Sequence, residues 1–396
     1  MIFPFSAKIS EADRHRYEID AVSGAFYGIF IGMMTPFIPI LMKRLSATPL
    51  EMGLALSAPY FSLVFGFPLL RYFTGWRALD IITVPTAVTR LAIAGVGFTD
   101  NTTAILLLYV LCQFVEGLGM GAYTRVLKEL YSDGSRSLAM GYVRFFIAMT
   151  TIVGSAVGGW MLDSGYKTAM FIIAGVCGML SSVNFNRVLP RDSSPTFATG
   201  GFSVGSVRTT LKASEGFYWL NVTIMLYGFG NLLMLGVLPT KLVTGWHVSN
   251  ATVGYLNGLT NVVQMFAYVV IGRFIAKHGS QRGLLLGMFG GLLNPWLFFL
   301  APTAAYLTVP YSFTGILNVG FDLSWMQLII AFAPVSELAI YGSVYTFLMG
   351  VRGIAAMLFS NLALSALGVD TFLALAGVFM LTGVSLAIWK RDAWKA

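Results

Sequence analysis

Five charged side chains lie within long apolar stretches of the sequence, where a charge is hardest to accommodate. They are Arg90, Glu116, Arg144, Asp322 and Arg352. A charge in a hydrocarbon environment is costly enough that such residues are candidates for binding or proton transfer by default. A carboxyl group that loses its water without gaining a cationic partner can bind a proton near neutral pH. Glu116 and Asp322 are therefore candidate coupling sites.

The same residues also allow a structural interpretation, in which opposite charges pair. At about 1.5 Å per helical residue, Glu116 lies roughly 18 Å and Asp322 roughly 17 Å from the cytoplasmic ends of their predicted helices. Arg90 lies at a depth similar to that of Glu116, and Arg352 falls on the helix after that of Asp322. Ion pairs Glu116–Arg90 and Asp322–Arg352 would offset the burial of each partner. Arg144 is close enough to a helix end to reach water by snorkelling. Both interpretations of the acids stay open.

Polar side chains recur at helical spacing around these charges. The sets are Tyr109, Gln113 and Glu116; Tyr227 and Asn231; Asn257, Asn261 and Gln264; Asn318 and Asp322; and Tyr341 and Tyr345. Residues three or four positions apart share one face of a helix. Such a face inside a membrane needs hydrogen-bonding partners, from other helices or from a wet cavity. For the Asn257 set we favour the cavity, with most of the ligand hydrogen bonds coming from the second half of the chain.

The elements that carry these residues are long apolar segments. The chain of 396 residues is 57% hydrophobic and 11% charged, whereas soluble domains carry roughly 25% charged residues. About 20 apolar helical residues are needed to cross a bilayer, and twelve such segments are predicted at 19–42, 51–74, 79–98, 103–128, 137–161, 166–186, 216–240, 250–275, 282–301, 306–333, 336–365 and 370–389. The predicted fold class is an all-α integral membrane protein.

The twelve segments form two similar halves. Glu51-Met52-Gly53-Leu54 matches Thr252-Val253-Gly254-Tyr255, and Leu138-Ala139-Met140-Gly141 matches Leu338-Ala339-Ile340-Tyr341, at nearly constant offsets. We predict a tail at 1–18, a six-helix bundle at 19–186, a linker at 187–215, a second six-helix bundle at 216–389 and a tail at 390–396. Parallel repeats of this kind place the substrate near the middle of the bilayer, between the halves.

The basic residues predict the orientation. Of the 25 Lys and Arg residues, 18 fall on the side of the N-terminus, four on the other side (Lys43, Arg44, Lys167 and Lys241) and three inside spans. This excess predicts that both termini face the cytoplasm, as expected for a multi-pass protein of the plasma (inner) membrane. Because the charges are dispersed through short loops, the net charge of +8 does not indicate nucleic-acid binding. No signal-peptide pattern precedes the first segment, which we expect to be an uncleaved anchor.

Three local patterns resemble the major facilitator superfamily. Gly272 to Arg282 is similar to the family's G-x-x-x-D-R-x-G-R-R loop with Ala276 at the Asp position, and Pro68 to Arg77 keeps Gly75 and basic residues with Tyr72 at that position. Gln113 to Gly119 resembles the family's R-x-x-Q-G-x-G, with Gln113 for the arginine associated with proton transfer and Glu116 for the glutamine. Gly154 to Gly159 is similar to the antiporter motif G-P-x-x-G-G without its proline. The resemblance implies two pseudo-symmetric six-helix bundles.

The resemblance also implies roles for the loops and the cavity. Loop residues that would control conformational change are Arg71, Gly75, Arg77, Gly272, Lys277, Gly279 and Arg282. Candidate substrate or coupling residues are Glu116, Gln113, Asp322, Arg352, Arg90, Asn257, Asn261, Gln264, Asn231, Asn318 and Tyr345. Two acids in one cavity favour a cationic or amphiphilic molecule as the substrate.

Gly24, Gly28 and Gly32 form a ridge of small residues on the first predicted helix. We expect this ridge to allow close helix packing. The alternative is a face that slides or bends during transport.

The sequence therefore predicts a secondary transporter of a small organic solute that works by alternating access, with protons as a candidate coupling ion. No nucleotide-binding loop indicates direct use of ATP. Alternatives are an uncoupled facilitator, a metal-ion transporter, or a receptor or scaffold that keeps the fold. We expect a monomer with no enzymatic activity, no cofactor and no resident metal, since His15, His247 and His278 lie in tails or loops.

Overall fold

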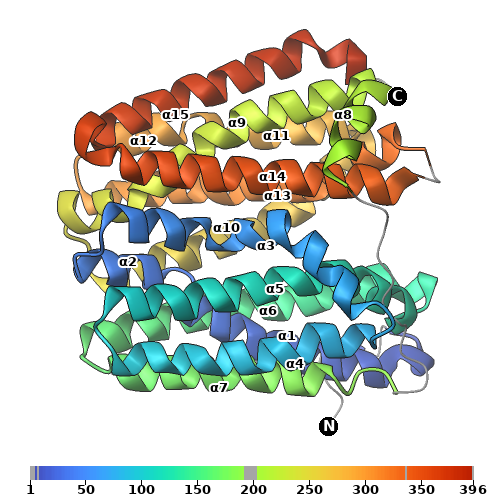
Figure 1. The fold of residues 1–396 in the computed structure, drawn as a ribbon, viewed down its shortest axis with the longest axis horizontal. Coiled ribbons are helices and arrows are strands. Elements are labelled where there is room, and N and C mark those ends of the chain that lie inside the picture. Colours follow the sequence, from blue (N-terminus) through green and yellow to red (C-terminus); the bar gives the residue numbers. More distant parts are fainter. Residues whose placement is uncertain (1–4, 7–8, 191–202, 335–336, 395–396) are drawn as a thin grey trace. The chain divides into compact units, whose positions relative to one another are not determined.

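The structure is a computed structural model that describes residues 5–6, 9–190, 203–334 and 337–394. The long elements in these ranges are all helices, and Figure 1 shows their course. They are α1 (Glu11–Met34), α2 (Phe37–Arg44), α3 (Pro49–Leu70), α4 (Ala78–Ala92), α5 (Thr102–Leu130), α6 (Asp133–Asp163), α7 (Lys167–Phe185), α8 (Val204–Ala213), α9 (Glu215–Thr240), α10 (Asn250–His278), α11 (Ser280–Leu292), α12 (Asn294–Leu300), α13 (Thr308–Phe332), α14 (Leu338–Leu362) and α15 (Leu364–Trp389).

The predicted fold class is confirmed. Among the described residues, 11 helical segments are long and apolar enough to cross a membrane. Helix α3, with 22 residues, occupies the remaining predicted segment and has the length of a bilayer crossing. Three of the membrane-crossing segments are not single regular α-helices. Pro36 separates α1 from α2, and a 3₁₀ turn at Ile93–Phe98 follows α4. Pro295 lies at the start of α12, which follows α11.

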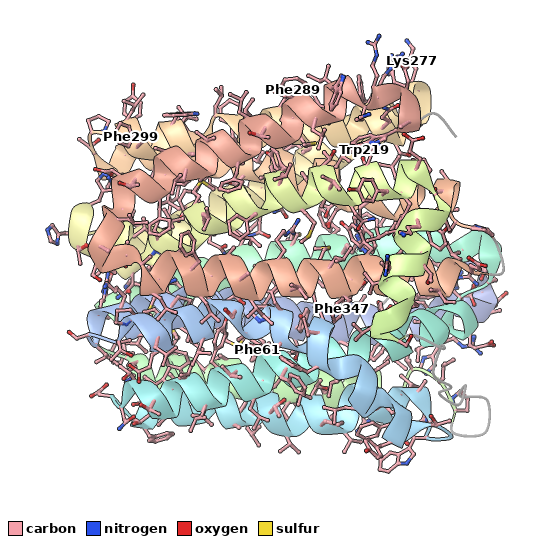
Figure 2. The ribbon with its side chains drawn as sticks, turned by 45° about the horizontal axis from the view of Figure 1, so that its top comes forward. Phe61, Trp219, Lys277, Phe289, Phe299 and Phe347 are labelled. Atoms are coloured by element: carbon pink, nitrogen blue, oxygen red, sulfur yellow. The ribbon has the colours of Figure 1, made fainter. Side chains whose placement is uncertain are left out.

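Large apolar side chains cover much of the outer surface of the helices. Phe266 is 72% and Leu300 70% exposed, which in water would favour aggregation but suits contact with lipid tails. In Figure 2, Phe289 and Phe299 project away from the ribbon, whereas Lys277 lies at the end of a helix. The exposed aromatic residues Trp160, Tyr166 and Trp389 lie near helix ends, where such rings prefer the interface between lipid and water.

Two boundaries differ from the prediction. Helix α1 begins at Glu11 and not at 19, because the predicted start followed only the apolar run. Glu11 and Asp13 lie in the first turn, where acidic residues favour the helix dipole, and the Ser10 hydroxyl donates to Asp13 at 2.8 Å. Within the predicted linker, α8 forms at Val204–Ala213. The remainder of the predicted linker lies partly outside the described residues, at 191–202.

The chain divides into two compact units, and each unit combines three stretches of the sequence. Unit 1 contains Met1–Ala47, Phe65–Thr199 and Ser249–Asn261. Unit 2 contains Thr48–Val64, Gly200–Val248 and Val262–Ala396. Each unit therefore includes part of one helix from the other half of the sequence: the first part of α10 in unit 1, and most of α3 in unit 2.

The C-terminal end of α6 holds the start of α10 within unit 1. Asp163 Oδ1 accepts from the backbone N of Asn250 at 2.9 Å and from its side chain at 2.8 Å, and Oδ2 accepts from the N of Ala251 at 2.7 Å. A carboxylate at a helix N-terminus satisfies backbone N–H groups that have no partner in the helix, and it also favours the helix dipole.

We expect Asp163→Asn to lower the free energy of unfolding by about 1 kcal/mol, the usual effect of losing a helix cap. Thermal unfolding in detergent measures this change. Asp100→Asn is the matched control in the same unit, because the Asp100 side chain is 78% exposed in its pair with Lys167 and such pairs contribute little. Equal unfolding temperatures for the two variants would contradict the capping role.

Candidate functional site

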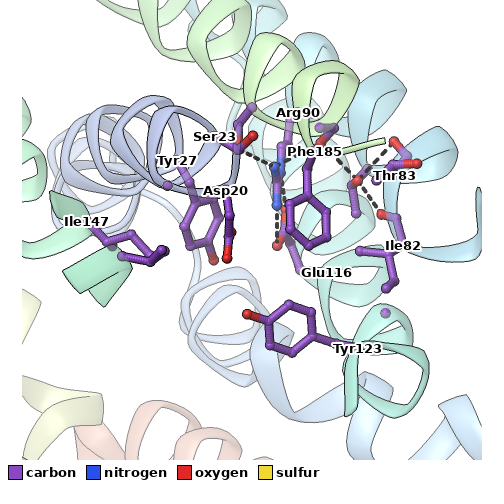
Figure 3. A pocket seen from close by; sticks show the side chains of 16 residues that line it. Asp20, Ser23, Tyr27, Ile82, Thr83, Arg90, Glu116, Tyr123, Ile147 and Phe185 are labelled. Atoms are coloured by element: carbon purple, nitrogen blue, oxygen red, sulfur yellow. Dashed lines mark hydrogen bonds and ion pairs between the residues drawn. The ribbon is translucent and has the colours of Figure 1, made fainter. Parts of the chain in front are cut away.

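A cavity of about 260 Å³ lies within unit 1 and is lined by α1, α4, α5, α6 and α7. Its polar lining is shown in Figure 3 and comprises Asp20, Ser23 and Tyr27 from α1, Thr83, Thr86 and Arg90 from α4, Glu116 and Tyr123 from α5, and Ser181 and Ser182 from α7. Val143 and Ile147 of α6 and Phe185 of α7 contribute apolar walls. The cavity therefore brings two acids and one base together within a single bundle.

Arg90 and Glu116 form a two-point ion pair in this cavity. Arg90 Nε lies 2.5 Å from Glu116 Oε1, and Nη2 donates to Oε2 at 3.0 Å. Nη1 donates to the hydroxyls of Ser182 at 2.8 Å and Ser181 at 3.3 Å. The guanidinium also lies 4.7 Å from the ring centre of Tyr27. Each nitrogen of Arg90 therefore has a partner.

The predicted pair Glu116–Arg90 is thus present in the structure. Arg90 is 8% exposed, and its charge is offset by Glu116 within the same bundle. Protonating Glu116 would remove the charge that offsets Arg90, which is unfavourable for a buried guanidinium. This arrangement favours a structural role for Glu116 over a role as the free proton site.

Asp20 is the acid that sequence reasoning missed. Its side chain is 5% exposed and accepts a hydrogen bond from the Tyr131 hydroxyl at 2.7 Å. Among the described residues no cationic side chain pairs with it. A first helix that begins at residue 19, as predicted, would place the Asp20 carboxylate at the membrane surface. With α1 beginning at Glu11, Asp20 lies about 14 Å along the helix. The sequence signal that could have revealed the buried position of Asp20 is the acidic residues directly after Ser10, because they favour the start of a helix there.

The second predicted pair, Asp322–Arg352, does not form. Asp322 is exposed and accepts from the Tyr268 hydroxyl at 2.6 Å. Arg352 is 7% exposed, and its Nη1 donates to the backbone carbonyl of Ile224 at 2.6 Å. Neighbouring helices do not guarantee that two side chains face each other, since direction around the helix axis decides this. Arg144 is exposed, as snorkelling requires.

The polar face of α10, formed by Asn257, Asn261 and Gln264, contributes in part to helix packing. Asn257 donates to the Ser155 hydroxyl of α6 at 2.7 Å, and Asn261 donates to the carbonyl of Asn257 at 2.8 Å. Both lie in unit 1, whereas Gln264 lies in unit 2, so the three residues do not act as one set within a unit. The Asn257 side chain is therefore held by a partner within the protein, and its place in a substrate cavity stays a prediction.

The other predicted site residues are distributed over both units. Gln113 in unit 1 and Asn231 in unit 2 are half-buried, and Asn318 in unit 2 is exposed. Tyr345 is 3% exposed and stacks on Trp325, with ring centres 5.0 Å apart. Of the candidate coupling residues, only Glu116 and Arg90 line the cavity of unit 1.

The predicted loop residues have distinct local roles. Gly75 and Gly279 adopt φ of +86° and +88°, a conformation that favours glycine. Arg77 donates to Asn186 Oδ1 at 3.0 Å and to the Leu189 carbonyl at 2.8 Å, which ties the start of α4 to the chain after α7. Gly272 is half-buried in α10, and Lys277 and Arg282 are exposed. Arg71 lies in a 3₁₀ turn at Arg71–Phe73.

Metal binding receives no support from the described part of the chain, which contains no group of three or more His, Cys, Asp or Glu side chains that could hold a metal ion. Cys112 and Cys177 are both free thiols.

Comparison with known proteins agrees with this architecture. The sequence profile of the Major Facilitator Superfamily matches residues 21–240. No curated protein sequence matches the chain. Solved structures that share 12–13% sequence identity with the chain support its fold alone.

A structure of a point mutant of the nucleoside transporter NupG has a TM-score of 0.69 and 13% identity, and the match covers 96% of this chain and 100% of that one. A bacterial homologue of the human lysosomal transporter Spinster, in an inward-facing and unoccupied conformation, has a TM-score of 0.65 and 12% identity, with 97% and 96% covered. A POT family transporter in complex with a thioalcohol-conjugated peptide has a TM-score of 0.75 and 13% identity, with 96% of each chain covered.

The all-helical membrane fold, the matched family profile and the similar transporter structures agree. They describe a multi-pass membrane protein of a transporter family that carries a small-molecule substrate. The chain therefore belongs to the Major Facilitator Superfamily and is a secondary transporter.

Proposed function

We propose that this transporter moves a small organic solute together with protons by alternating access, and that Asp20 binds the proton. The observation that carries the proposal is a carboxylate, 5% exposed, in a cavity of about 260 Å³ with no cationic partner among the described residues. A buried carboxylate without a countercharge is costly when ionised, and binding a proton removes that cost.

The hydrogen bond of Asp20 supports a reversible proton site. The Tyr131 hydroxyl donates to Asp20 Oδ2 at 2.7 Å, and a carbonyl oxygen accepts such a bond whether or not the other oxygen carries a proton. Protonation of Asp20 therefore leaves its surroundings intact. Glu116, by contrast, engages Arg90 through both oxygens. Asp322, which accepts from Tyr268, stays a second candidate in unit 2.

The distribution of basic residues supports an orientation for this function. The excess of 18 over four Lys and Arg residues favours a protein of the plasma membrane with both termini in the cytoplasm. We propose that the chain acts as a monomer, because each unit encloses its own core.

The test uses Asp20→Asn, which keeps an acceptor for Tyr131 and removes the titratable carboxyl. In liposomes, a solute first identified by thermal shift against a solute library is offered with and without a pH gradient. For one proton per solute, one pH unit supports about tenfold accumulation. We expect Asp20→Asn to lose this accumulation and to retain counterflow of the same solute.

Two controls separate proton binding from a structural role. Tyr131→Phe removes the hydrogen bond and keeps the carboxyl, so pH-driven accumulation should persist. Infrared difference spectra between acid and neutral pH should show a carboxylic C=O band in the wild type that Asp20→Asn lacks, a measurement that needs no solute. Full pH-driven accumulation by Asp20→Asn would rule out this site. Counterflow by the wild type with no accumulation under a pH gradient would favour an uncoupled facilitator.

A further inference from the structure

Unit 2 contains a buried arginine whose hydrogen-bonding groups are mostly unused. Arg352 of α14 is 7% exposed, and its single hydrogen bond in the described chain runs from Nη1 to the Ile224 carbonyl at 2.6 Å. Nε is fully buried and has no partner. Leaving a buried donor unpaired is unfavourable, so such a group in a native structure calls for an explanation.

Arg352 also lacks a countercharge. Within the described residues, the ionisable groups close enough to act on it electrostatically are the phenols of Tyr345 and Tyr60. Asp322, the acid predicted to pair with it, instead accepts from Tyr268. Removing one partner of a buried ion pair is strongly unfavourable because it leaves a buried charge without compensation. A guanidinium in that situation is suited to a negative charge that comes from outside the chain.

The surroundings of Arg352 are shaped to hold it. A Cβ on Gly228 would lie 2.0 Å from Arg352 Nη1, so the guanidinium occupies space that only glycine leaves open. A Cβ on Gly353 would lie 2.2 Å from the ring of Tyr60. Tyr345 is fixed by stacking on Trp325, with 7° between the rings. Gly228 thus leaves the space that the guanidinium occupies, and the phenols of Tyr345 and Tyr60 lie near enough to act on it electrostatically.

One edge of the Arg352 guanidinium has no hydrogen-bonding partner among the described residues, and the corresponding edge of Arg90 binds Glu116. In Arg90, Nε and Nη2 bind the two oxygens of Glu116, at 2.5 and 3.0 Å. In Arg352, the hydrogen bond to Ile224 uses Nη1, which leaves Nε and Nη2. These two nitrogens form the planar fork that matches a carboxylate or a phosphate. The edge that carries an internal acid in unit 1 is thus unoccupied by any described side chain in unit 2.

We propose that Arg352 binds the anionic group, a carboxylate or a phosphate, of the transported solute. The phenols of Tyr345 and Tyr60 lie beside that group as donors and as ring surfaces for its organic part. The proposal rests on the proposed transport function and replaces the cationic substrate that the sequence favoured. With a proton on Asp20, a solute of one negative charge would cross the membrane without net movement of charge.

The test uses the full chain in vesicles of neutral phosphatidylcholine and four matched probes: benzoate, phenyl phosphate, benzamide and benzylamine. We expect benzoate or phenyl phosphate to raise the unfolding temperature of the wild type, and benzamide and benzylamine to leave it unchanged. The two anionic probes distinguish a carboxylate site from a phosphate site. A rise caused only by adding phosphatidylglycerol to the vesicles would assign the arginine to lipid and overturn the proposal.

Two variants distinguish a ligand site from a structural arginine. Arg352→Met should abolish the effect of the anions and, without any probe, unfold at the same or a higher temperature, because an uncompensated buried charge is replaced by an apolar chain of similar length. Arg352→Lys should bind the anion at least about tenfold more weakly, since it lacks the planar fork. A lower unfolding temperature for probe-free Arg352→Met, or an undiminished anion effect in it, would overturn the proposal.

Failure of this proposal is separable from failure of the proposed function. Anion binding is measured without a pH gradient and does not depend on Asp20. Asp20→Asn should therefore keep the full rise in unfolding temperature that the anionic probe causes. Loss of pH-driven accumulation in Asp20→Asn with no anion response in the wild type would leave proton coupling standing and remove the anion site.

Discussion

Arg90→Met is expected to lower the free energy of unfolding by about 3–5 kcal/mol, the cost of leaving a buried charge without its partner. Arg90 binds Glu116 through two nitrogens and the hydroxyls of Ser181 and Ser182 through the third. In the variant, Glu116 would keep its buried position without a cation, and both serine hydroxyls would lose a donor. Thermal unfolding in detergent and the yield of folded protein measure the effect.

The matched variant is Arg90→Met combined with Glu116→Gln. Since the double variant removes both charges, we expect it to recover most of the lost stability, as a coupled pair should in a double-mutant cycle. Arg144→Met is the control for loss of a positive charge in a helix, because Arg144 is exposed. A double variant no more stable than Arg90→Met would show that the pair is not the source of the stabilisation.

Gly28→Ala is expected to be the second most damaging change, with a loss of about 1–3 kcal/mol or more from overpacking. A Cβ on Gly28 would lie 2.4 Å from the backbone carbonyl oxygen of Ile147 and 2.0 Å from Thr150 Oγ1 on α6. The threonine side chain could rotate, but the carbonyl belongs to the helix backbone and cannot move alone. Helices α1 and α6 would therefore have to separate.

Substitutions of two further glycines provide comparisons for this result. Gly24→Ala should be milder, because its Cβ would meet side-chain atoms of Val143 and Ile147 at 3.1 Å. Gly141→Ala on α6 should be neutral or slightly stabilising, because nothing lies within 4 Å of its Cβ and alanine favours helices over glycine. If Gly28→Ala unfolds at the temperature of Gly141→Ala, the ridge is not closely packed and the sliding face becomes the better interpretation.

The two arginines show how far the sequence can lead toward a mechanism. Arg90 and Arg352 both lie inside spans and both have an acid on a neighbouring span. The structure gives Arg90 an internal acid and leaves Arg352 with the Ile224 carbonyl. The same residue type therefore supports a structural interpretation in unit 1 and a binding interpretation in unit 2, which no local pattern could have separated.

The sequence by itself determined the membrane class, the positions of the crossing segments and the depth of each charge. These properties are local: apolar length sets a crossing, and a fixed rise per residue sets depth. Depth was enough to predict the pair of Arg90 and Glu116, which lie at the same level on helices that pack together.

Only the tertiary structure decided which charges meet. The direction of a side chain around its helix depends on how neighbouring helices pack, so Asp322 meets Tyr268 and not Arg352. The extension of α1 to Glu11, beyond its apolar run, placed Asp20 inside the cavity. Asn257 contributes to helix packing because its side chain donates a hydrogen bond to Ser155, which is distant in sequence. Such long-range contacts determine whether a polar group is satisfied by the protein or left for a ligand.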